Sequence, residues 1–274
     1  MQKAVKKITA LALQPNHMGF TSVDMFHSEF DFEPFLVFTE FHMDKAIFGP
    51  HPHAGMSVMT YMLPDSQGSF LNRDSLGDHS IIEPGGLHVT QAGSGIKHDE
   101  VPTINGVDCH GFQIWINHAD KDRLVQPKAF HAFSKEVPEY NDSHILLRVI
   151  QGSYKNLQSP VALVTNTSLF DITLQTNTTI ELEADVMAFI YLMKGTIIID
   201  GKEISHNAMI SFEKEGNTVL VTTGSAIAHF MFASGKPHNE PIVYGGPFVM
   251  TTPEQLKATQ DRLQRGLMGV LAPL

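Results

Sequence analysis

The chain has 274 residues, of which 42% are hydrophobic and 18% are charged. This composition suits two domains of ordinary size or one large all-β domain, and it excludes a disordered or coiled-coil chain. The formal net charge of −10 argues against direct nucleic-acid binding, since neutralising phosphates requires a basic face.

The start of the chain and its one cysteine indicate the compartment. Cys109 cannot form an intrachain disulfide, so a reducing compartment is favoured, and its strand-like context predicts a buried structural thiol. The apolar run at residues 8–13 is too short for the core of a signal peptide. No stretch reaches the roughly 20 apolar residues that span a bilayer. We therefore expect a soluble, cytoplasmic protein that does not contact membranes.

Short β-branched and aromatic runs, bounded by Gly, Pro, Asn and Asp, occur along almost the whole chain. They predict strands at residues 35–38, 58–63, 111–116, 145–150, 189–193, 196–199 and 218–222. Strands at this spacing, without long helices between them, predict an all-β sandwich or barrel. Residues 118–143 interrupt the pattern, and we expect them to connect two β domains.

One helix is predicted near the end of the chain. Thr252 is placed to cap it, Pro253 occupies its first position, and Gly266 marks its end. We expect this helix to pack on the outside of a β domain and to have no catalytic role. The predicted domains are residues 1–130 and residues 131–274, the second of which ends in the helix.

Two short motifs carry the predicted chemistry. In an extended chain, residues two positions apart point to the same face. His51 and His53 of the first motif therefore share a face, and so do His98 and Glu100 of the second. If the two pairs face each other, they offer three imidazole nitrogens and one carboxylate. This ligand set suits Fe(II), Mn(II), Ni(II), Cu(II) or Zn(II) and leaves coordination positions open for water, O2 or substrate.

The segment before the second motif is rich in glycine. Residues 84–86 and 92–95 predict tight turns that bend the backbone, so that the second pair is aimed inward. No cysteine stands among the candidate ligands, which argues against a structural zinc site. The three histidines of the second half, His206, His229 and His238, form neither motif. We therefore expect one metal site, in the first half of the chain.

Several segments resemble, in order, the motifs of the pirin family. The resemblance spans about residues 17–270 and is carried by residues 49–55, 73–77, 84–85, 92–100, 111–117 and 245–250. It implies two tandem cupin domains, which are double-stranded β-helices of the jelly-roll type, with metal in the N-terminal one only. In the family, the positions that match His51, His53, His98 and Glu100 bind one divalent metal. The resemblance implies Fe(II), with Mn, Ni, Cu, Co or Zn as substitutes.

Five positions depart from the family pattern. Ser57 stands where pirins usually have Glu, and Asn72 stands where they commonly have His. Ala54, Gly86 and Val89 replace a usual Arg, Asp and large aromatic residue. We expect these last three at the rim of the site, where they alter the choice of substrate and leave the four ligands intact.

The resemblance implies a quercetinase-like enzyme, a flavonol 2,3-dioxygenase that consumes O2 and releases carbon monoxide. Glu100 would be its catalytic base, and the small partners would be an aromatic flavonol and O2. One alternative is a metal- or redox-dependent regulatory protein that acts through protein contacts, which eukaryotic pirins resemble more. Another is a structural bicupin that has lost its activity. The family resemblance also implies a monomer.

Overall fold

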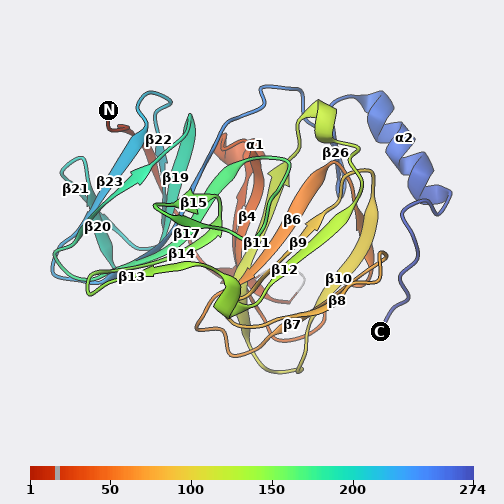
Figure 1. Ribbon diagram of the computed structural model, residues 1–274, viewed down its shortest axis with the longest axis horizontal. Helices are drawn as coiled ribbons and strands as arrows, with labels where there is room; N and C mark the ends of the chain where they lie inside the picture. The colour runs from red at the N-terminus through yellow and green to blue at the C-terminus, as the bar shows by residue number, and fades with distance from the viewer. Residues whose placement is uncertain (16–18) are drawn as a thin grey trace. The chain divides into compact units, whose positions relative to one another are not determined.

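A computed structural model of the chain describes residues 1–15 and 19–274 (Figure 1). Residues 17 and 18, with which the predicted family resemblance begins, lie outside the described residues. Strands dominate both halves of the chain, and one longer helix follows them, so the predicted all-β fold class is confirmed. Each of the seven predicted strands lies at a strand of the structure, with ends that differ by at most five residues.

The chain forms two compact units. The N-terminal unit comprises residues 13–136, 163–165 and 238–274, and the C-terminal unit comprises residues 1–12, 137–162 and 166–237. Each unit thus includes a terminal segment from the opposite end of the chain. The division at residues 130 and 131 that the sequence suggests remains a prediction, and the contacts divide the chain after residue 136.

The N-terminal unit contains two larger antiparallel sheets. The first has seven strands, in the order β12 (Lys128–Ala132), β9 (Leu87–Gln91), β6 (Met56–Met62), β11 (Cys109–Asn117), β4 (Phe35–Met43), β3 (Thr21–Phe26) and β2 (Gln14–Pro15). The second has four strands, in the order β5 (His51–His53), β10 (Ile96–Pro102), β7 (Phe70–Asp74) and β8 (His79–Ile82). The unit also contains the hairpin of β25 (Val243–Gly245) and β26 (Phe248–Met250), and the short helix α1 (His27–Phe30).

Residues 118–143, predicted as a connector, contain more structure than that prediction implies. They include the 3-10 turns η1 (Asp120–Asp122) and η2 (Ser134–Glu136) and the strand β12, which pairs with β9. The polar sequence at the start of this segment did not indicate that one of its residues is buried. Arg123 is fully buried, and its guanidinium donates hydrogen bonds to Thr251 Oγ1, Asn117 Oδ1 and two backbone carbonyls. Partners from distant parts of the chain, which the local pattern does not show, make this burial tolerable.

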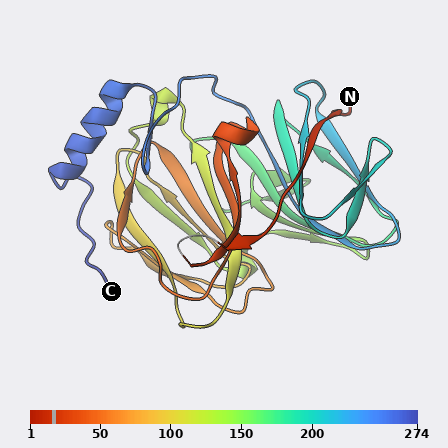
Figure 2. The same ribbon diagram turned by 180° about the vertical axis from the view of Figure 1, so that it is seen from behind.

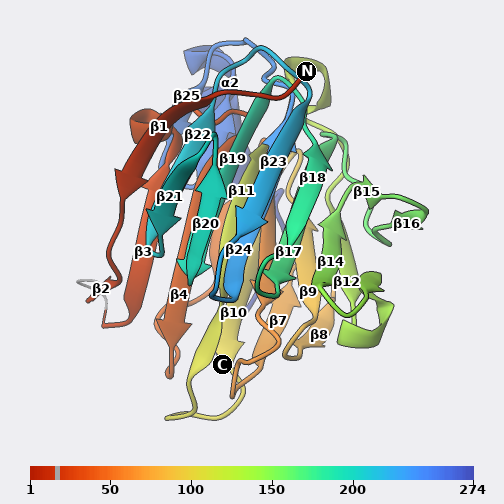
Figure 3. The same ribbon diagram turned by 90° about the vertical axis from the view of Figure 1, so that its left-hand side faces the viewer.

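The C-terminal unit repeats the arrangement of a seven-stranded and a four-stranded sheet. Its larger sheet has the order β1 (Val5–Ala10), β22 (Ala208–Phe212), β19 (Met187–Lys194), β24 (Ala228–Gly235), β17 (Thr167–Leu174), β14 (Ile145–Gln151) and β13 (Glu139–Asn141). Its smaller sheet has the order β18 (Thr179–Glu183), β23 (Thr218–Thr223), β20 (Thr196–Ile199) and β21 (Lys202–Ser205), and a hairpin joins β15 (Ser153–Tyr154) to β16 (Leu157–Gln158). Figure 3 shows the N-terminal strand β1 beside β22, its antiparallel partner.

The interior of the C-terminal unit is apolar. Side chains from both of its sheets form one buried cluster, which includes Leu147, Ile190, Val221 and Phe230. Alternating side chains along the strands produce this core. In β18, for example, exposed and buried residues alternate, so every second side chain points into the cluster. Burial of these side chains from both sheets therefore stabilises the C-terminal unit through the hydrophobic effect.

The C-terminal helix α2 (Pro253–Gln264) lies on the outside of the N-terminal unit (Figure 2). Thr252 caps it as predicted, because its side chain accepts a hydrogen bond from the Gln255 N–H while the Gln255 side chain accepts one from Thr252 N–H. Leu256 and Leu263 pack against a buried cluster that contains Phe248 and Met268. Neither this helix nor any other helix among residues 1–15 and 19–274 is both long and apolar enough to span a membrane.

Candidate metal centre

Strand pairing brings the two predicted motifs together. β5 is a three-residue edge strand that runs antiparallel to β10, and His51 lies directly opposite His98. A proline at the middle of β5 is tolerated because an edge strand needs fewer ladder hydrogen bonds. The ring centroids of His51, His53 and His98 lie 4.8–4.9 Å apart. One ligand atom from each of the three lies within 4.8 Å of the other two.

Two of the three imidazoles have buried ring nitrogens that suit a metal ion. Both ring nitrogens of His53 and Nε2 of His98 are buried and have no hydrogen-bond partner. An unsatisfied buried polar atom costs about 1–3 kcal/mol, and coordination by an ion would satisfy it. His51 Nδ1 lies 2.9 Å from the Gly49 carbonyl oxygen, and this contact sets the tautomer that leaves Nε2 free to bind an ion.

Burial keeps two of these imidazoles neutral, the form that binds metals. Desolvation by burial, together with the nearby charge of His51, lowers the pKa of His53 to about 3. The same causes hold the pKa of His98 well below its ordinary value. A neutral imidazole offers a lone pair at ordinary pH, so no proton has to leave before an ion binds.

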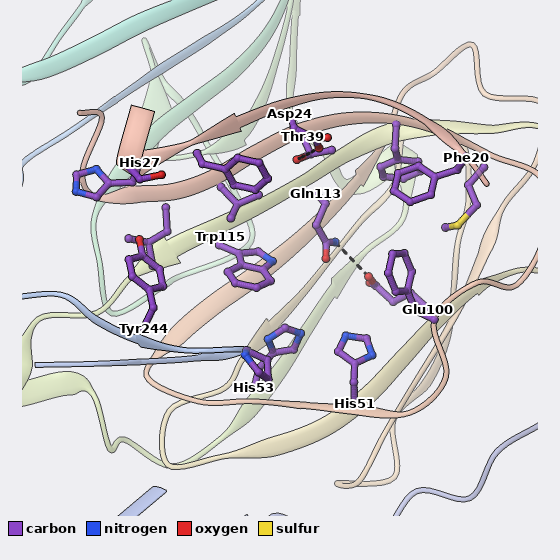
Figure 4. Close-up of a pocket in the computed structure, with 18 of the residues that line it drawn as sticks. Phe20, Asp24, His27, Thr39, His51, His53, Glu100, Gln113, Trp115 and Tyr244 are labelled. Carbon is purple, nitrogen blue, oxygen red and sulfur yellow. Dashed lines mark hydrogen bonds between the residues drawn. The ribbon is translucent and has the colours of Figure 1, made fainter. Parts of the chain in front are cut away.

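Glu100 lies two residues after His98, on the same face of β10, but it is not part of the 4.8 Å group. Its Oε2 accepts a hydrogen bond from Thr60 Oγ1 at 2.7 Å. It also accepts one from Gln113 Nε2 at 3.2 Å (Figure 4). Burial raises the pKa of the Glu100 carboxyl to about 7, against the hydrogen bond from Thr60, which lowers it. The carboxylate of Glu100 thus lies near the histidines. Thr60 and Gln113, from the seven-stranded sheet, fix its position through their hydrogen bonds.

A cavity of about 550 Å³ is lined at one end by His51, His53 and Glu100. Residues of β3, β4 and β11 line it, and many of its wall residues are aromatic (Figure 4). The wall residues include Phe20, Phe26, Phe41, Phe48, Phe70 and Trp115. The few polar side chains among them, such as Asp24, Thr39 and Gln113, come from neighbouring strands. A flat, largely apolar molecule with a small number of polar groups suits such a lining.

Sequence reasoning did not assign roles to Gln113 and Trp115. Gln113 donates to both Thr60 and Glu100, and the indole of Trp115 packs edge-on against His53, with ring centroids 5.1 Å apart. The indole Nε1 is buried without a hydrogen-bond partner. Both residues lie in the strand predicted at residues 111–116. Alternation places them on one face, but only the neighbouring strands show that this face lines the cavity.

The glycine-rich turn before the second motif has a steric cause. Gly93 has a φ of +49°, and a Cβ atom at this position would lie 2.1 Å from the Val125 carbonyl oxygen. Any other residue would clash with the backbone there, so the turn that precedes β10 requires glycine. The predicted role of these glycines in aiming the second motif agrees with this close approach.

The positions expected at the rim lie elsewhere. Ala54 and Val89 are fully buried, and neither they nor Gly86 belong to the described residues that line the cavity. Ser57 is buried beside His118, with Oγ 2.8 Å from Nε2 of that histidine. The expectation that the changes at Ala54, Gly86 and Val89 reshape the rim was therefore wrong. The side chains of Ala54 and Val89 pack in the buried interior away from the cavity, and Gly86 has no side chain to reach it.

Family profiles match most of the chain. The profile described as Pirin matches residues 8–116, and the profile described as Pirin C-terminal cupin domain matches residues 169–269. The chain belongs to the pirin family. Its two-cupin architecture, predicted from the sequence, is confirmed by these matches and by the cupin-fold structures that resemble it.

Named relatives in the pirin family cover most of the chain. A pirin-like protein of Arabidopsis thaliana is 33% identical, over 94% of this chain and 87% of its own length. Human Pirin is 30% identical, over 82% of this chain and 79% of its own length. The family assignment therefore rests on most of the chain, including the part that carries the candidate metal-binding histidines.

Solved structures support the fold. Quercetin 2,3-dioxygenase from Acinetobacter baumannii superposes with a TM-score of 0.88 at 20% identity and covers 99% of this chain and 100% of its own. The bacterial pirin YhhW from Escherichia coli, in complex with nickel(II), gives a TM-score of 0.66 at 17% identity, over 84% of this chain and 100% of its own. At these identities the likeness is one of fold.

Proposed function

We propose that this pirin is a metal-dependent dioxygenase that cleaves flavonols such as quercetin. The observation that carries the proposal is a cluster of three imidazoles, two of which line a cavity of about 550 Å³ with many aromatic side chains. Enzyme sites that bind a flat aromatic substrate at a metal need both features. The fold that the chain shares with a quercetin 2,3-dioxygenase adds support.

The proposed metal ligands are His51, His53, His98 and Glu100. Glu100 joins the set through Oε1, because Thr60 and Gln113 both donate to Oε2. Iron(II) is the proposed native ion, since three nitrogens and a carboxylate suit it and leave positions open. The same set accepts Mn, Ni, Cu, Co or Zn, and the nickel(II) held by the Escherichia coli relative agrees with this breadth.

The protein's own residues position the substrate and receive its proton. The aromatic wall, including Phe48 and Trp115, holds the flavonol rings and excludes water. Glu100 accepts the proton of the substrate 3-hydroxyl, and Thr60 and Gln113 keep the carboxylate in place during that transfer. When bound, the metal lowers the pKa of this hydroxyl and brings substrate and O2 together. Both oxygen atoms of O2 enter the product and one ring carbon leaves as carbon monoxide, so no external reductant is needed.

The test compares wild type with Glu100→Ala and Glu100→Gln after anaerobic loading with Fe(II). Quercetin absorbance, O2 uptake and carbon monoxide release are then measured together in air. Glu181→Gln, a change at an exposed strand position of the C-terminal unit, is the matched control. We expect wild type and the control to consume equal amounts of quercetin and O2, and the Glu100 variants to lose about 10²–10⁴-fold in turnover.

The iron content of each variant separates two reasons for failure. Wild type that binds iron without O2 uptake would overturn the flavonol assignment and favour a metal-dependent binding protein. Wild type that binds no divalent metal would overturn the proposed centre itself. A Glu100→Gln variant that keeps both iron and full turnover would remove Glu100 from the mechanism.

A further inference from the structure

A second group of potential metal ligands lies on strands β4 and β11. It consists of Glu40, His42 and His110, and one ligand atom from each lies within 4.8 Å of the other two. His42 and His110 are directly opposite each other in the antiparallel ladder. Their rings stack at a centroid distance of 3.9 Å and an interplanar angle of 15°. Stacked rings hold their nitrogen lone pairs parallel, so an ion that binds one nitrogen of each ring requires one ring to turn about its Cβ–Cγ bond.

This group is separate from the aromatic cavity. Thr39, Phe41 and Met43 of β4 line that cavity. Side chains alternate along a strand, so Glu40 and His42 point to the opposite face of the sheet. The side chains of Glu40, His110 and His42 are 12%, 16% and 29% exposed, which leaves an ion a route from solvent.

Carboxylates orient both imidazoles in the way that metal-binding histidines are oriented. His42 Nδ1 lies 2.8 Å from Asp108 Oδ2, which leaves His42 Nε2 as its ligand atom. His110 Nδ1 faces Asp65 Oδ1 at 3.5 Å, and His110 Nε2 lies 2.8 Å from Glu40 Oε1. Metal ligands of this type commonly donate their second N–H to a carboxylate, which fixes the tautomer.

The hydrogen-bonding capacity of the His110 ring is a further argument for a bound ion. Carboxylates face both of its ring nitrogens, but a neutral imidazole has only one N–H to share. An ion bound to Nε2 would satisfy this nitrogen and Glu40 Oε1 together. Two ligands of a tetrahedral Zn²⁺ lie about 3.3 Å apart, so the 2.8 Å contact between these atoms would open by about half an ångström.

The surroundings attract cations. Four carboxylates, those of Glu40, Asp44, Asp65 and Asp108, lie in or beside the group. A hollow of about 430 Å³ is bordered by His42, Asp44 and Asp108. Carboxylates that surround such a hollow raise the local concentration of divalent ions.

We propose that Glu40, His42 and His110 form a second binding site for a divalent transition metal, in addition to the one site expected from the sequence, with Asp108 and Asp65 as positioning residues. Two imidazoles and one carboxylate favour ions of the zinc and copper class over Mg²⁺ or Ca²⁺, which prefer oxygen ligands. The site is independent of the centre at His51, His53 and His98. Its test therefore does not depend on whether the protein is a dioxygenase.

Equilibrium dialysis against Zn²⁺ tests the site in the full chain. The background carries His51→Ala and His98→Ala, which remove the first centre and leave the second to be counted. We expect this background to bind about one equivalent of Zn²⁺ and to lose it when His42→Ala is added. His206→Ala, at an exposed histidine of the C-terminal unit, is the matched control and should keep the equivalent. A background that binds no Zn²⁺, or binding unaffected by His42→Ala, would overturn the proposal.

Two further measurements guard against a variant that merely misfolds. Asp108→Asn leaves all three ligands in place, and we expect it to weaken Zn²⁺ binding about 10–100-fold without changing the stoichiometry. In NMR spectra, Zn²⁺ should shift the imidazole resonances of His42 and His110 in the background protein and leave that of His206 unchanged. Unshifted His42 and His110 resonances would show that the group is an ion-pair network only.

Discussion

Thr60 Oγ1 donates a 2.7 Å hydrogen bond to Glu100 Oε2, and both side chains are buried. Gln113 lies opposite Thr60 in the ladder of β6 and β11 and donates to Thr60 Oγ1 and Glu100 Oε2. The larger sheet thus holds a carboxylate that belongs to the smaller one. Glu100 is positioned by tertiary contacts that sequence spacing around the second motif does not contain.

Replacement of Thr60 by valine removes this hydrogen bond with little change in volume. We expect Thr60→Val to lower the free energy of unfolding by about 1–3 kcal/mol, because a buried carboxyl group loses a donor. Metal affinity should fall about 10–100-fold, since the proposed ligand is less well oriented. Thr176→Val, at an exposed loop position, should change neither quantity. Chemical denaturation and metal titration check the two effects, and an unaltered Thr60→Val protein would contradict the role of this contact.

Metal removal should destabilise the protein through the histidine cluster. An ion that binds only the folded state stabilises it by about 2.7 kcal/mol when the free ion is at 100 times its Kd. We expect a chelator to lower the midpoint of thermal unfolding of wild type by roughly 5 °C or more. His98→Ala should abolish this metal-dependent difference in the unfolding midpoint, and His206→Ala should retain it. Equal midpoints with and without metal in wild type would argue against the centre.

The thiol of Cys109 should be unreactive in the folded protein. Burial, and to a smaller extent the charges of Asp108 and Asp44, raise its pKa to about 12. Because the thiolate is the reactive form, only about one molecule in 10,000 would carry it at pH 8. We expect a thiol-labelling reagent to leave native protein unmodified and to label it fully in guanidinium chloride. Rapid labelling of native protein would instead indicate an accessible, redox-active cysteine.

The capping box of α2 should stabilise the end of the N-terminal unit measurably. Thr252→Ala removes the acceptor for the Gln255 N–H and should reduce stability by about 1 kcal/mol. Thr252→Ser keeps a hydroxyl oxygen and should recover most of the loss. Denaturant unfolding, together with amide hydrogen exchange in α2, distinguishes the two variants. Equal exchange rates in both would mean that packing of Leu256 and Leu263 alone holds the helix.

The buried guanidinium of Arg123 should be among the most sensitive positions in the N-terminal unit. It donates to Asn117 Oδ1 at 2.8 Å and to the carbonyl oxygens of Gly55 and Val249. Arg123→Ala leaves these buried acceptors without a donor, and we expect a loss of about 3–5 kcal/mol. Arg123→Lys should recover only part, because an ammonium group cannot reproduce the planar fork. Arg265→Ala, at an exposed arginine, is the control in the same unfolding assay.

Local patterns predicted seven of the strands and the C-terminal helix. Alternation and turn residues locate β4, β11 and β20, and Thr252 with Pro253 locates the start of α2. These features depend on neighbours along the chain, so they can be recognised in a short window. The same reasoning missed β12, since its polar, proline-flanked surroundings are typical of a connector.

The amino-acid sequence by itself determined the all-β class, the shared face of His51 and His53, and the shared face of His98 and Glu100. Period-two geometry is a local property of an extended chain, which is why these pairs could be recognised. Only the tertiary structure decided that β5 pairs with β10, that Gln113 and Thr60 hold Glu100, and that His42 stacks on His110. Those relationships join residues far apart in the chain. Their register is set by the packing of whole sheets, which no single segment of sequence specifies.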